Sequence, residues 1–427
     1  MDPRPNPLPA WQDRLFMLTA IGMALVYLAG CFTPLHLHFD SIRYYDIKDC
    51  IEFGCPPDSF AATDFLPYGY TFLLVGLSKL GILSAFSIVL VNCIYLFGTV
   101  FFISRIFGRR VHPYLYALIL LFHWLMIKFT VHPLSELQYI FFSSASLYCF
   151  HQYLQRKSFL FLGLAVVFSL FTVLTRTVGI ALLPALVLGA LWHHRKQLIP
   201  IIQKHKFKLI LGGVVLLAGM YFSATQLKVT SYTSSLKENY AGGSRLQLFI
   251  DNLLLHFREL GEVLINMPAG KLLDFLPGTA GIALFVVLGL LFLGWITWVC
   301  ISRKAGIPVY IKLYLLFYAF IILNWPYYDP RFWAPLVPLF AAILLCTPWP
   351  RPVFRSLAKV YIGFYLLVGA AAAVYSLKLG FNKAEFAGKH AAGVYRNEYE
   401  THFFGKPLSD TATHVDAHIV DLLNKYD

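Results

Sequence analysis

The sequence predicts an all-α polytopic membrane protein with about eleven transmembrane helices and further in-plane helices on its outer face. The first observation behind this prediction is composition. Of the 427 residues, 58% are hydrophobic and only 13% are charged, whereas soluble domains carry about 25% charged residues. The second observation is that the charges fall in short loops between apolar runs, as membrane orientation requires. The net charge of +13 is therefore not a clustered nucleic-acid-binding stripe, and we expect no nucleic-acid partner.

The apolar runs give the predicted spans in chain order. A membrane-spanning helix needs about 20 mostly apolar residues. The runs that approach this length are 15–33, 85–104, 113–129, 134–151, 159–175, 177–192, 209–226, 279–300, 312–325, 333–347 and 359–377. Segment 67–83 is also apolar, but Gly69, Gly76, Lys79 and Gly81 interrupt it.

The positions of Lys and Arg set the orientation, because basic residues favour the cytoplasmic side of a membrane. If 67–83 does not cross, the basic loops between spans face the cytoplasm, where Asp2 and Asp13 are the only acidic residues. We therefore expect 67–83 to be a re-entrant or in-plane helix on the outer face. The N-terminus is then cytoplasmic and the C-terminus lies outside. A bacterial inner membrane is the expected location, and the endoplasmic reticulum is the alternative.

This topology divides the chain into a transmembrane domain, 1–377, and a small polar tail outside the cytoplasm, 378–427. The domain includes two long outer loops, 34–84 and 227–278. In the second loop, Arg245–Met267 has apolar residues near helical spacing, which predicts an amphipathic helix on the membrane surface. Cys50 and Cys55 share the first loop, where a disulfide and two free thiols are both open alternatives.

The segment after the first span contains the first candidate for catalysis. Asp40 lies within seven residues of the predicted membrane edge, where a carboxylate can accept a proton from an acceptor hydroxyl. The alternative is that Asp40 caps a helix beginning at Ser41. His36 and His38 are weak candidates for a metal site with Asp40, and ordinary loop histidines are the alternative.

The outer turn before the fourth span contains the second candidate carboxylate, Glu136, four residues after His132. Glu136 follows Pro133 at a predicted helix N-terminus. A proline in the first turn and an early glutamate both favour the start of a helix. Glu136 is therefore either a helix-start residue or a functional acid.

Two arginines at the outer membrane level form the third candidate. Arg176 lies between the fifth and sixth spans, and Arg331 lies in the turn 324–338 with Tyr328 and Asp329. An arginine among apolar helices must snorkel towards water or bind an anion, and its planar fork matches phosphate. Snorkelling and an interfacial belt of aromatic residues are the alternatives. The two arginines with nearby carboxylates suggest a phosphate-bearing lipid headgroup held at the interface.

Together these motifs resemble the GT-C superfamily of membrane glycosyltransferases, whose members include protein mannosyltransferases and the lipid A aminoarabinose transferase. The resemblance covers about 15–345 and rests on the order and common outer location of four short motifs. These are Asp40 followed by Tyr44, the segment Leu66–Tyr70 with a later span ending in Arg105–Arg110, the turn Thr175–Gly179, and the motif Tyr328–Pro338.

The resemblance implies transfer of a sugar from a polyprenyl-phosphate donor to an acceptor on the outer face, with Asp40 as general base. It implies that Arg176, Arg331 and Tyr328 bind the donor phosphate, and Glu136 loosely matches a second acidic position of some relatives. The other residues expected to contact substrate are Tyr44, Tyr45, His132 and Asp329. Membrane lipids are the further expected partners.

The chain departs from the family pattern in two respects. Ser41 follows Asp40 where an acidic pair is known in relatives, and the large soluble C-terminal domain of several relatives is lacking. The acceptor, which is a glycan, a lipid or a protein, is therefore open, as is dependence on a divalent metal. No cofactor is certain.

Two other functions are carried as alternatives. A transporter or flippase for a lipid-linked saccharide predicts polar or charged groups at mid-membrane positions, and the predicted spans have few. The second alternative is a non-catalytic assembly subunit, for which Asp40 has no effect on turnover.

Overall fold

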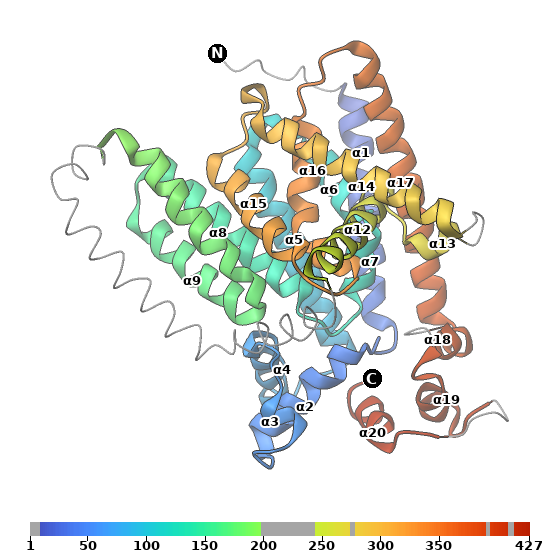
Figure 1. Cartoon of the computed structure of the whole chain (residues 1–427). Coiled ribbons are helices and arrows are strands. Elements are labelled where there is room, and N and C mark those ends of the chain that lie inside the picture. The colour runs from blue at the N-terminus through green and yellow to red at the C-terminus, as the bar shows by residue number, and fades with distance from the viewer. Residues whose placement is uncertain (1–8, 198–243, 274–277, 390–392, 409–413) are drawn as a thin grey trace.

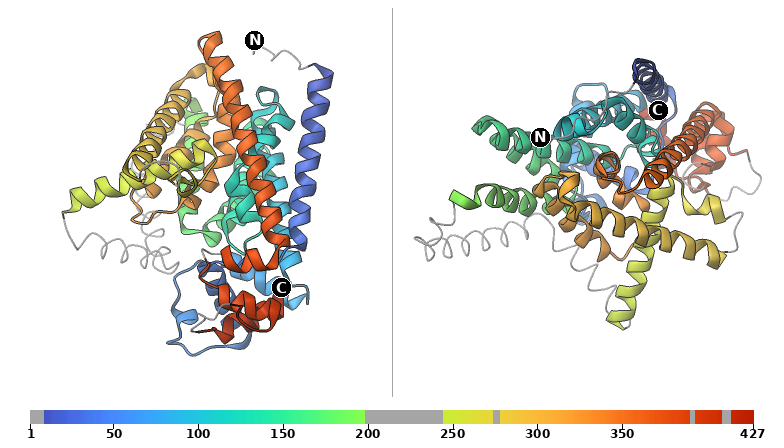
Figure 2. Two further views of the ribbon diagram at one scale, coloured as in Figure 1. Left: turned by 90° about the vertical axis from the view of Figure 1, so that its right-hand side faces the viewer. Right: turned by 90° about the horizontal axis from the view of Figure 1, so that it is seen from above.

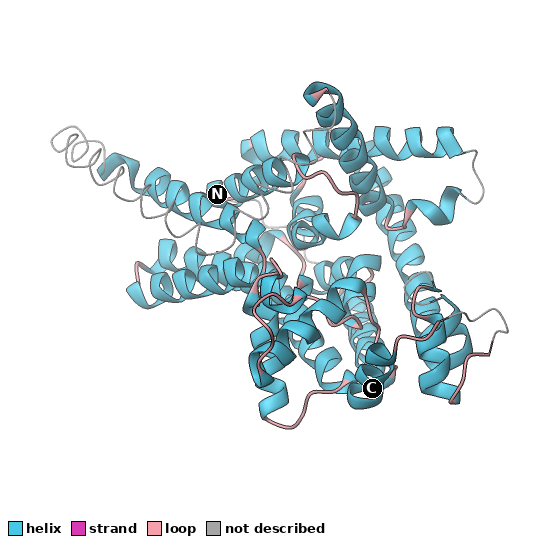
Figure 3. Cartoon of the chain, turned by 60° about the horizontal axis from the view of Figure 1, so that its bottom comes forward, coloured by secondary structure: helices cyan, strands magenta, loops and turns pink. Residues whose placement is uncertain are grey.

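The computed structural model describes residues 9–197, 244–273, 278–389, 393–408 and 414–427. Within these ranges the chain forms helices joined by loops and contains no strand (Figure 3). The all-α prediction is confirmed for this part of the chain. The predicted span 209–226 lies outside the described residues.

Five of the described helices are long and apolar enough to cross a membrane. They are α1 (Ala10–Ala29) with the turn that follows it, α5 (Ala85–Phe107), the helix Thr177–Gln197, α14 (Gly278–Ile301) and α17 (Pro352–Phe381). The pair α6 (Pro113–Leu121) and α7 (Trp124–Thr130) passes the same test when taken as one span, which raises the count to six. These helices are compatible with a multi-pass membrane protein.

The remaining predicted spans in the described ranges fall on helices that do not pass this test. They are α8 (Glu136–Arg156), α9 (Phe159–Thr175), α15 (Val309–Leu323) and α16 (Val337–Cys346). The last three are apolar but short. Helix α8 is long, but it buries polar side chains such as Gln138, Ser143 and Ser146 against its neighbours.

The predicted span 113–129 is a broken helix rather than a straight one, because α6 and α7 meet at an angle of 69°. A break inside a membrane exposes backbone groups that need hydrogen-bond partners. The side chain of Asn266 supplies them, accepting from the Trp124 N–H at 2.8 Å and donating to the Phe122 carbonyl at 2.8 Å and to the Tyr365 carbonyl at 3.0 Å. A Cβ at Gly369 of α17 would lie 1.9 Å from the same Phe122 oxygen, so only glycine fits there.

The amphipathic helix predicted at Arg245–Met267 is present as α12 (Arg245–Ile265). Its apolar residues Leu246, Ile250 and Leu254 are exposed, whereas its polar residues His256, Glu259 and Glu262 are buried against the protein. Helix α12 packs closely on α14, where a Cβ at Gly289 would lie 1.8 Å from the Phe257 oxygen. The polar stripe formed by His256, Glu259 and Glu262 therefore contacts protein.

The loop after α1 and the C-terminal tail, both predicted to lie outside the cytoplasm, gather at one end of the bundle (Figures 1 and 2). The loop forms α2 (Phe39–Phe53), α3 (Phe60–Thr63) and α4 (Tyr68–Lys79), and the tail forms α18 (Lys383–Lys389), α19 (Arg396–Phe404) and α20 (Ala417–Tyr426). With 12 residues, α4 is shorter than the ~20 residues of a spanning helix. A disulfide joins Cys50 and Cys55 at the end of α2.

Candidate active site at one end of the helix bundle

Asp40 lies in the first turn of α2, and the local sequence fixes its position. His38 is the N-cap of the helix, because its Nδ1 accepts from the Asp40 N–H at 3.3 Å and its own N–H donates to Ser41 Oγ at 3.1 Å. The Asp40 carboxylate accepts from Arg43 Nη1 at 2.9 Å, one turn along the helix. Arg43 is held in turn by both oxygens of buried Asp64, at 2.6 and 2.8 Å.

Arg331 reaches Asp40 from the other side of the site. It lies at the start of the short helix η5 (Pro330–Leu336), whose N-cap Asp329 accepts from the Arg331 N–H at 2.9 Å. The Arg331 Nη1 atom lies 2.6 Å from Asp40 Oδ2, and its Nε atom lies 2.9 Å from Asp329 Oδ2. The guanidinium therefore sits between two carboxylates.

A second ion pair completes the group. Glu136 is the first residue of α8, and Arg176 ends α9 as its C-cap. Arg176 Nη1 bonds to Glu136 Oε1, and Arg331 Nη1 lies 3.9 Å from the same oxygen. The structure thus brings together Asp40, Glu136, Arg176 and Arg331, which we call the charge cluster.

The charge cluster is largely but not completely buried. Glu136 is almost fully buried, with 2% of its side chain exposed, whereas Asp40, Arg176 and Arg331 retain 14 to 17%. Burial raises the pKa of Asp40, but the charges of Arg331 and Arg43 outweigh it and hold this pKa below its ordinary value. Asp40 is therefore an ionised carboxylate whose two oxygens are each bonded to a guanidinium.

Some of the other predicted site residues border the cluster and some do not. Tyr44 is buried and donates to Ser135 Oγ at 3.0 Å, next to Glu136, and Asp329 contacts Arg331 as described above. Tyr45 lies away from the cluster, where its ring stacks on Tyr426 of the tail at 5.0 Å between centroids. Tyr328 bonds to Glu262 on α12 and has the Arg258 guanidinium over its ring.

The candidate histidines are packed into the structure around the start of α2. The rings of His36 and His132 lie 5.4 Å apart, and His132 Nδ1 is 2.6 Å from the Lys128 carbonyl oxygen. His38 acts as the helix cap described above. Among the residues that the structure describes, no group of three or more His, Cys, Asp and Glu side chains is arranged to hold a metal ion.

The structure adds a polar stripe on α12 that we did not predict. Glu259 accepts from the Asp329 N–H at 2.6 Å and from Trp333 Nε1 at 2.9 Å, and it lies 2.7 Å from His256 Nδ1. These contacts fix the loop that carries Arg331. The spacing of His256, Glu259 and Glu262 along one helix face was the available signal, but it does not reveal the partner.

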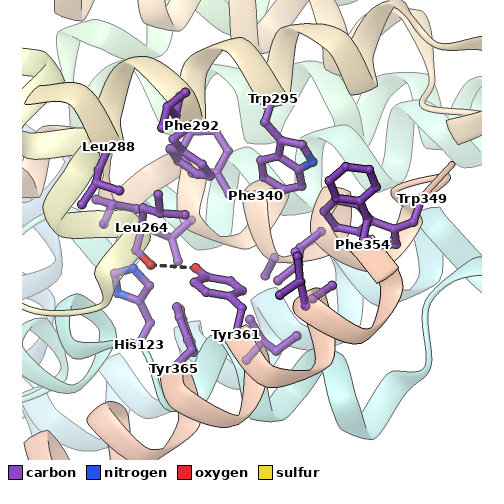
Figure 4. A pocket seen from close by; sticks show the side chains of 18 residues that line it. His123, Leu264, Leu288, Phe292, Trp295, Phe340, Trp349, Phe354, Tyr361 and Tyr365 are labelled. Atoms are coloured by element: carbon purple, nitrogen blue, oxygen red, sulfur yellow. Dashed lines mark hydrogen bonds between the residues drawn. The ribbon is translucent and has the colours of Figure 1, made fainter. Parts of the chain in front are cut away.

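An apolar cavity of about 320 Å³ lies elsewhere in the bundle (Figure 4). It is lined by side chains of α12, α14, α16, α17 and the loop between the last two helices, which include Leu264, Phe292, Phe340, Trp349 and Tyr361. No member of the charge cluster lines it. It is therefore a separate space in the apolar part of the protein.

Comparisons of the chain with protein-family models, with curated proteins and with solved structures find no match. The family assignment therefore stays a prediction from the motifs.

Proposed function

We propose that this protein is a membrane glycosyltransferase of the GT-C type, which transfers a sugar from a polyprenyl-phosphate donor. The observation that carries the proposal is the charge cluster, in which Arg331 Nη1 lies 2.6 Å from Asp40 Oδ2 at one end of an apolar helix bundle. Guanidinium groups bind a phosphate headgroup, and a carboxylate accepts a proton from a nucleophile. Apolar packing requires neither group, so their convergence favours a chemical role.

In the proposed reaction, the acceptor oxygen forms a bond to the anomeric carbon while the bond from that carbon to the phosphate oxygen breaks. The bonding electron pair leaves with the phosphate, whose added charge Arg176 and Arg331 stabilise. The acceptor proton passes to Asp40. The Oε2 atom of Glu136 is buried without a hydrogen-bond partner among the described residues, and in the proposed reaction it accepts a hydrogen bond from a sugar hydroxyl.

The proposal includes the membrane arrangement expected from the sequence. About eleven spans, an inner-membrane location, a cytoplasmic N-terminus and an outer C-terminus place the charge cluster on the outer face. The start of α1 and the tail helix α20 lie at opposite ends of the bundle, which supports an odd number of crossings (Figure 1).

Donor turnover by the purified protein in lipid nanodiscs tests the proposal. A panel of polyprenyl-phosphate sugars is offered with a crude acceptor extract, and free polyprenyl phosphate is measured by mass spectrometry. We expect release by the wild type and a loss of at least ~100-fold in Asp40→Asn, because general bases contribute that much or more. The matched control is Asp46→Asn on the same helix, where Asp46 bonds to His418 instead.

The outcomes separate the functions. No release with any donor would favour transport or an assembly role. If wild type and Asp40→Asn release equal amounts of polyprenyl phosphate, the protein is still a transferase but Asp40 is not its general base.

A further inference from the structure

The charge cluster has no spare positive charge for a ligand. Its two carboxylates and two guanidinium groups cancel, and Arg331 is shared by three acidic side chains at 2.6, 2.9 and 3.9 Å. A phosphate that enters must therefore compete with a carboxylate for a guanidinium group whose charge is already paired. The two ion pairs differ in how easily the carboxylate can lose its guanidinium partner.

The contacts single out the pair of Arg331 and Asp40. The alternative pair, Arg176 with Glu136, includes a carboxylate that is only 2% exposed, and separating a buried pair leaves an uncompensated charge. Asp40 and Arg331 are more accessible, at 14 and 17%. Both groups also have other partners to hold them when they part.

Asp40 would stay in place after losing Arg331. Its Oδ1 atom remains bonded to Arg43 at 2.9 Å, and Arg43 is anchored by both oxygens of Asp64. Arg331 likewise keeps its ion-pair contact with Asp329, 2.9 Å from Nε to Oδ2, and Asp329 lies on the loop fixed by Glu259. Only the bond from Arg331 Nη1 to Asp40 Oδ2 has to be exchanged.

We propose that the Arg331–Asp40 ion pair is a latch that the donor phosphate opens. The phosphate takes over Nη1 of Arg331, and this exchange frees Oδ2 of Asp40 to receive the acceptor proton. This inference rests on the proposed function for the identity of the anion and of the base. Asp40 is masked in the empty protein, and the donor binds before the acceptor can react.

The latch makes a prediction that runs against the usual effect of removing a site residue. Because Asp40 competes with phosphate for Arg331, Asp40→Asn binds farnesyl phosphate more tightly than the wild type. We expect a gain of about 5- to 20-fold in affinity, within the range of couplings between linked sites. Calorimetry of each protein in nanodiscs measures it, and Asp40→Ala tests the same competition without the new amide.

A gain in affinity also follows from removing any negative charge near an anion, so a double-mutant cycle is needed. If Asp40 acts through Arg331, the gain in affinity from Asp40→Asn is much smaller in an Arg331→Gln background than in the wild type. Asp46→Asn, which changes the same charge on the same helix, leaves the affinity unchanged. A gain of equal size in the Arg331→Gln background would overturn the latch.

Two further ligands identify what opens the latch. Farnesol, which lacks the phosphate, binds wild type and Asp40→Asn equally. If Asp40→Asn gains as much affinity for inorganic phosphate as for farnesyl phosphate, this result supports the latch and shows that the headgroup alone is sufficient. A gain for farnesol as large as that for farnesyl phosphate would overturn it.

The latch and the proposed function fail in different ways. If Asp40→Asn loses turnover but does not bind farnesyl phosphate more tightly, Asp40 is still supported as the base and the latch is overturned. Tighter phosphate binding that depends on Arg331, in a wild type that turns over no donor, supports the latch and overturns the transferase.

Discussion

At the scale of single residues, Glu262 gives the clearest link between burial and pH. Its carboxyl is buried on α12 beside Glu259, Arg258 and the Tyr328 hydroxyl. Burial outweighs the hydrogen bond from Tyr328 and raises the pKa of Glu262 to about 7. An acid whose pKa is raised by folding stabilises the folded state at low pH. This stabilisation is lost as the pH rises from the unfolded pKa through the folded one.

We therefore predict that the free energy of unfolding in nanodiscs falls by roughly 2 to 3 kcal/mol between pH 5 and pH 8, as expected from the pKa shift of Glu262. Glu262→Gln resembles the protonated acid, so its stability changes little over that range and exceeds the wild type at pH 8. Glu385→Gln on α18 is the control, since this side chain is partly exposed. A slope in Glu262→Gln equal to that of the wild type would contradict the prediction.

The residues of the charge cluster could be proposed from sequence because each follows or precedes an apolar run. Asp40, Glu136, Arg176 and Arg331 all fall at predicted outer ends of helices, and such ends meet at one membrane level. The sequence could not show that Tyr45 and Tyr328 face other partners. It also could not show Asp64 or Glu259 as supports, because which side chain a helix face meets depends on tertiary packing.

At the scale of elements, Asn266 holds the broken helix together. It satisfies two backbone groups at the break and a third, the Tyr365 carbonyl, on α17, and it has a φ of 64°, a left-handed conformation that asparagine tolerates better than alanine. We predict that Asn266→Ala lowers the free energy of unfolding by roughly 3 to 5 kcal/mol, since each unsatisfied buried group costs about 1 to 3 kcal/mol. Denaturant unfolding in mixed micelles measures the loss.

The matched control is Asn324→Ala, in which the side chain makes one exposed bond to the Phe320 carbonyl. We expect a change within about 0.5 kcal/mol, as for other surface substitutions. Equal losses for the two variants would show that Asn266 does not stabilise the break.

The positions of the helices were largely predictable, whereas their geometry was not. Apolar runs located α1, α5, α14 and α17 because span length is set by the membrane. The same rule predicted one span at 113–129, because the run is mostly apolar despite His123 and Lys128. The group that stabilises the bend, Asn266, lies far away in sequence. Hydropathy likewise located α12 but could not show that its polar face meets the loop of Arg331.

At the scale of the whole molecule, the tail is part of the site's support and not a separate appendage. Tyr399 of α19 is fully buried, and its hydroxyl accepts from the Leu37 N–H at 2.9 Å and donates to the Leu35 carbonyl. Asp427 Oδ1 accepts from the Leu35 N–H at 2.7 Å. These bonds hold the segment that leads into the cap and first turn of α2. The position of Asp40 therefore depends on residues more than 350 positions away in the sequence.

We predict that Tyr399→Phe loosens this segment, because it removes the buried hydroxyl that bonds to the Leu37 N–H and the Leu35 carbonyl. Hydrogen exchange of the peptide 34–41 measures the effect, and we expect rates roughly 10-fold or more above the wild type, equivalent to a loss of ~1.4 kcal/mol or more. Tyr375→Phe on α17, where the side chain is partly exposed, is the control and leaves this peptide unchanged. Faster exchange confined to α19, with 34–41 unaffected, would mean that the tail folds on its own and does not position Asp40. If turnover is established, a fall in Tyr399→Phe together with faster exchange at 34–41 would show that the tail acts through the start of α2.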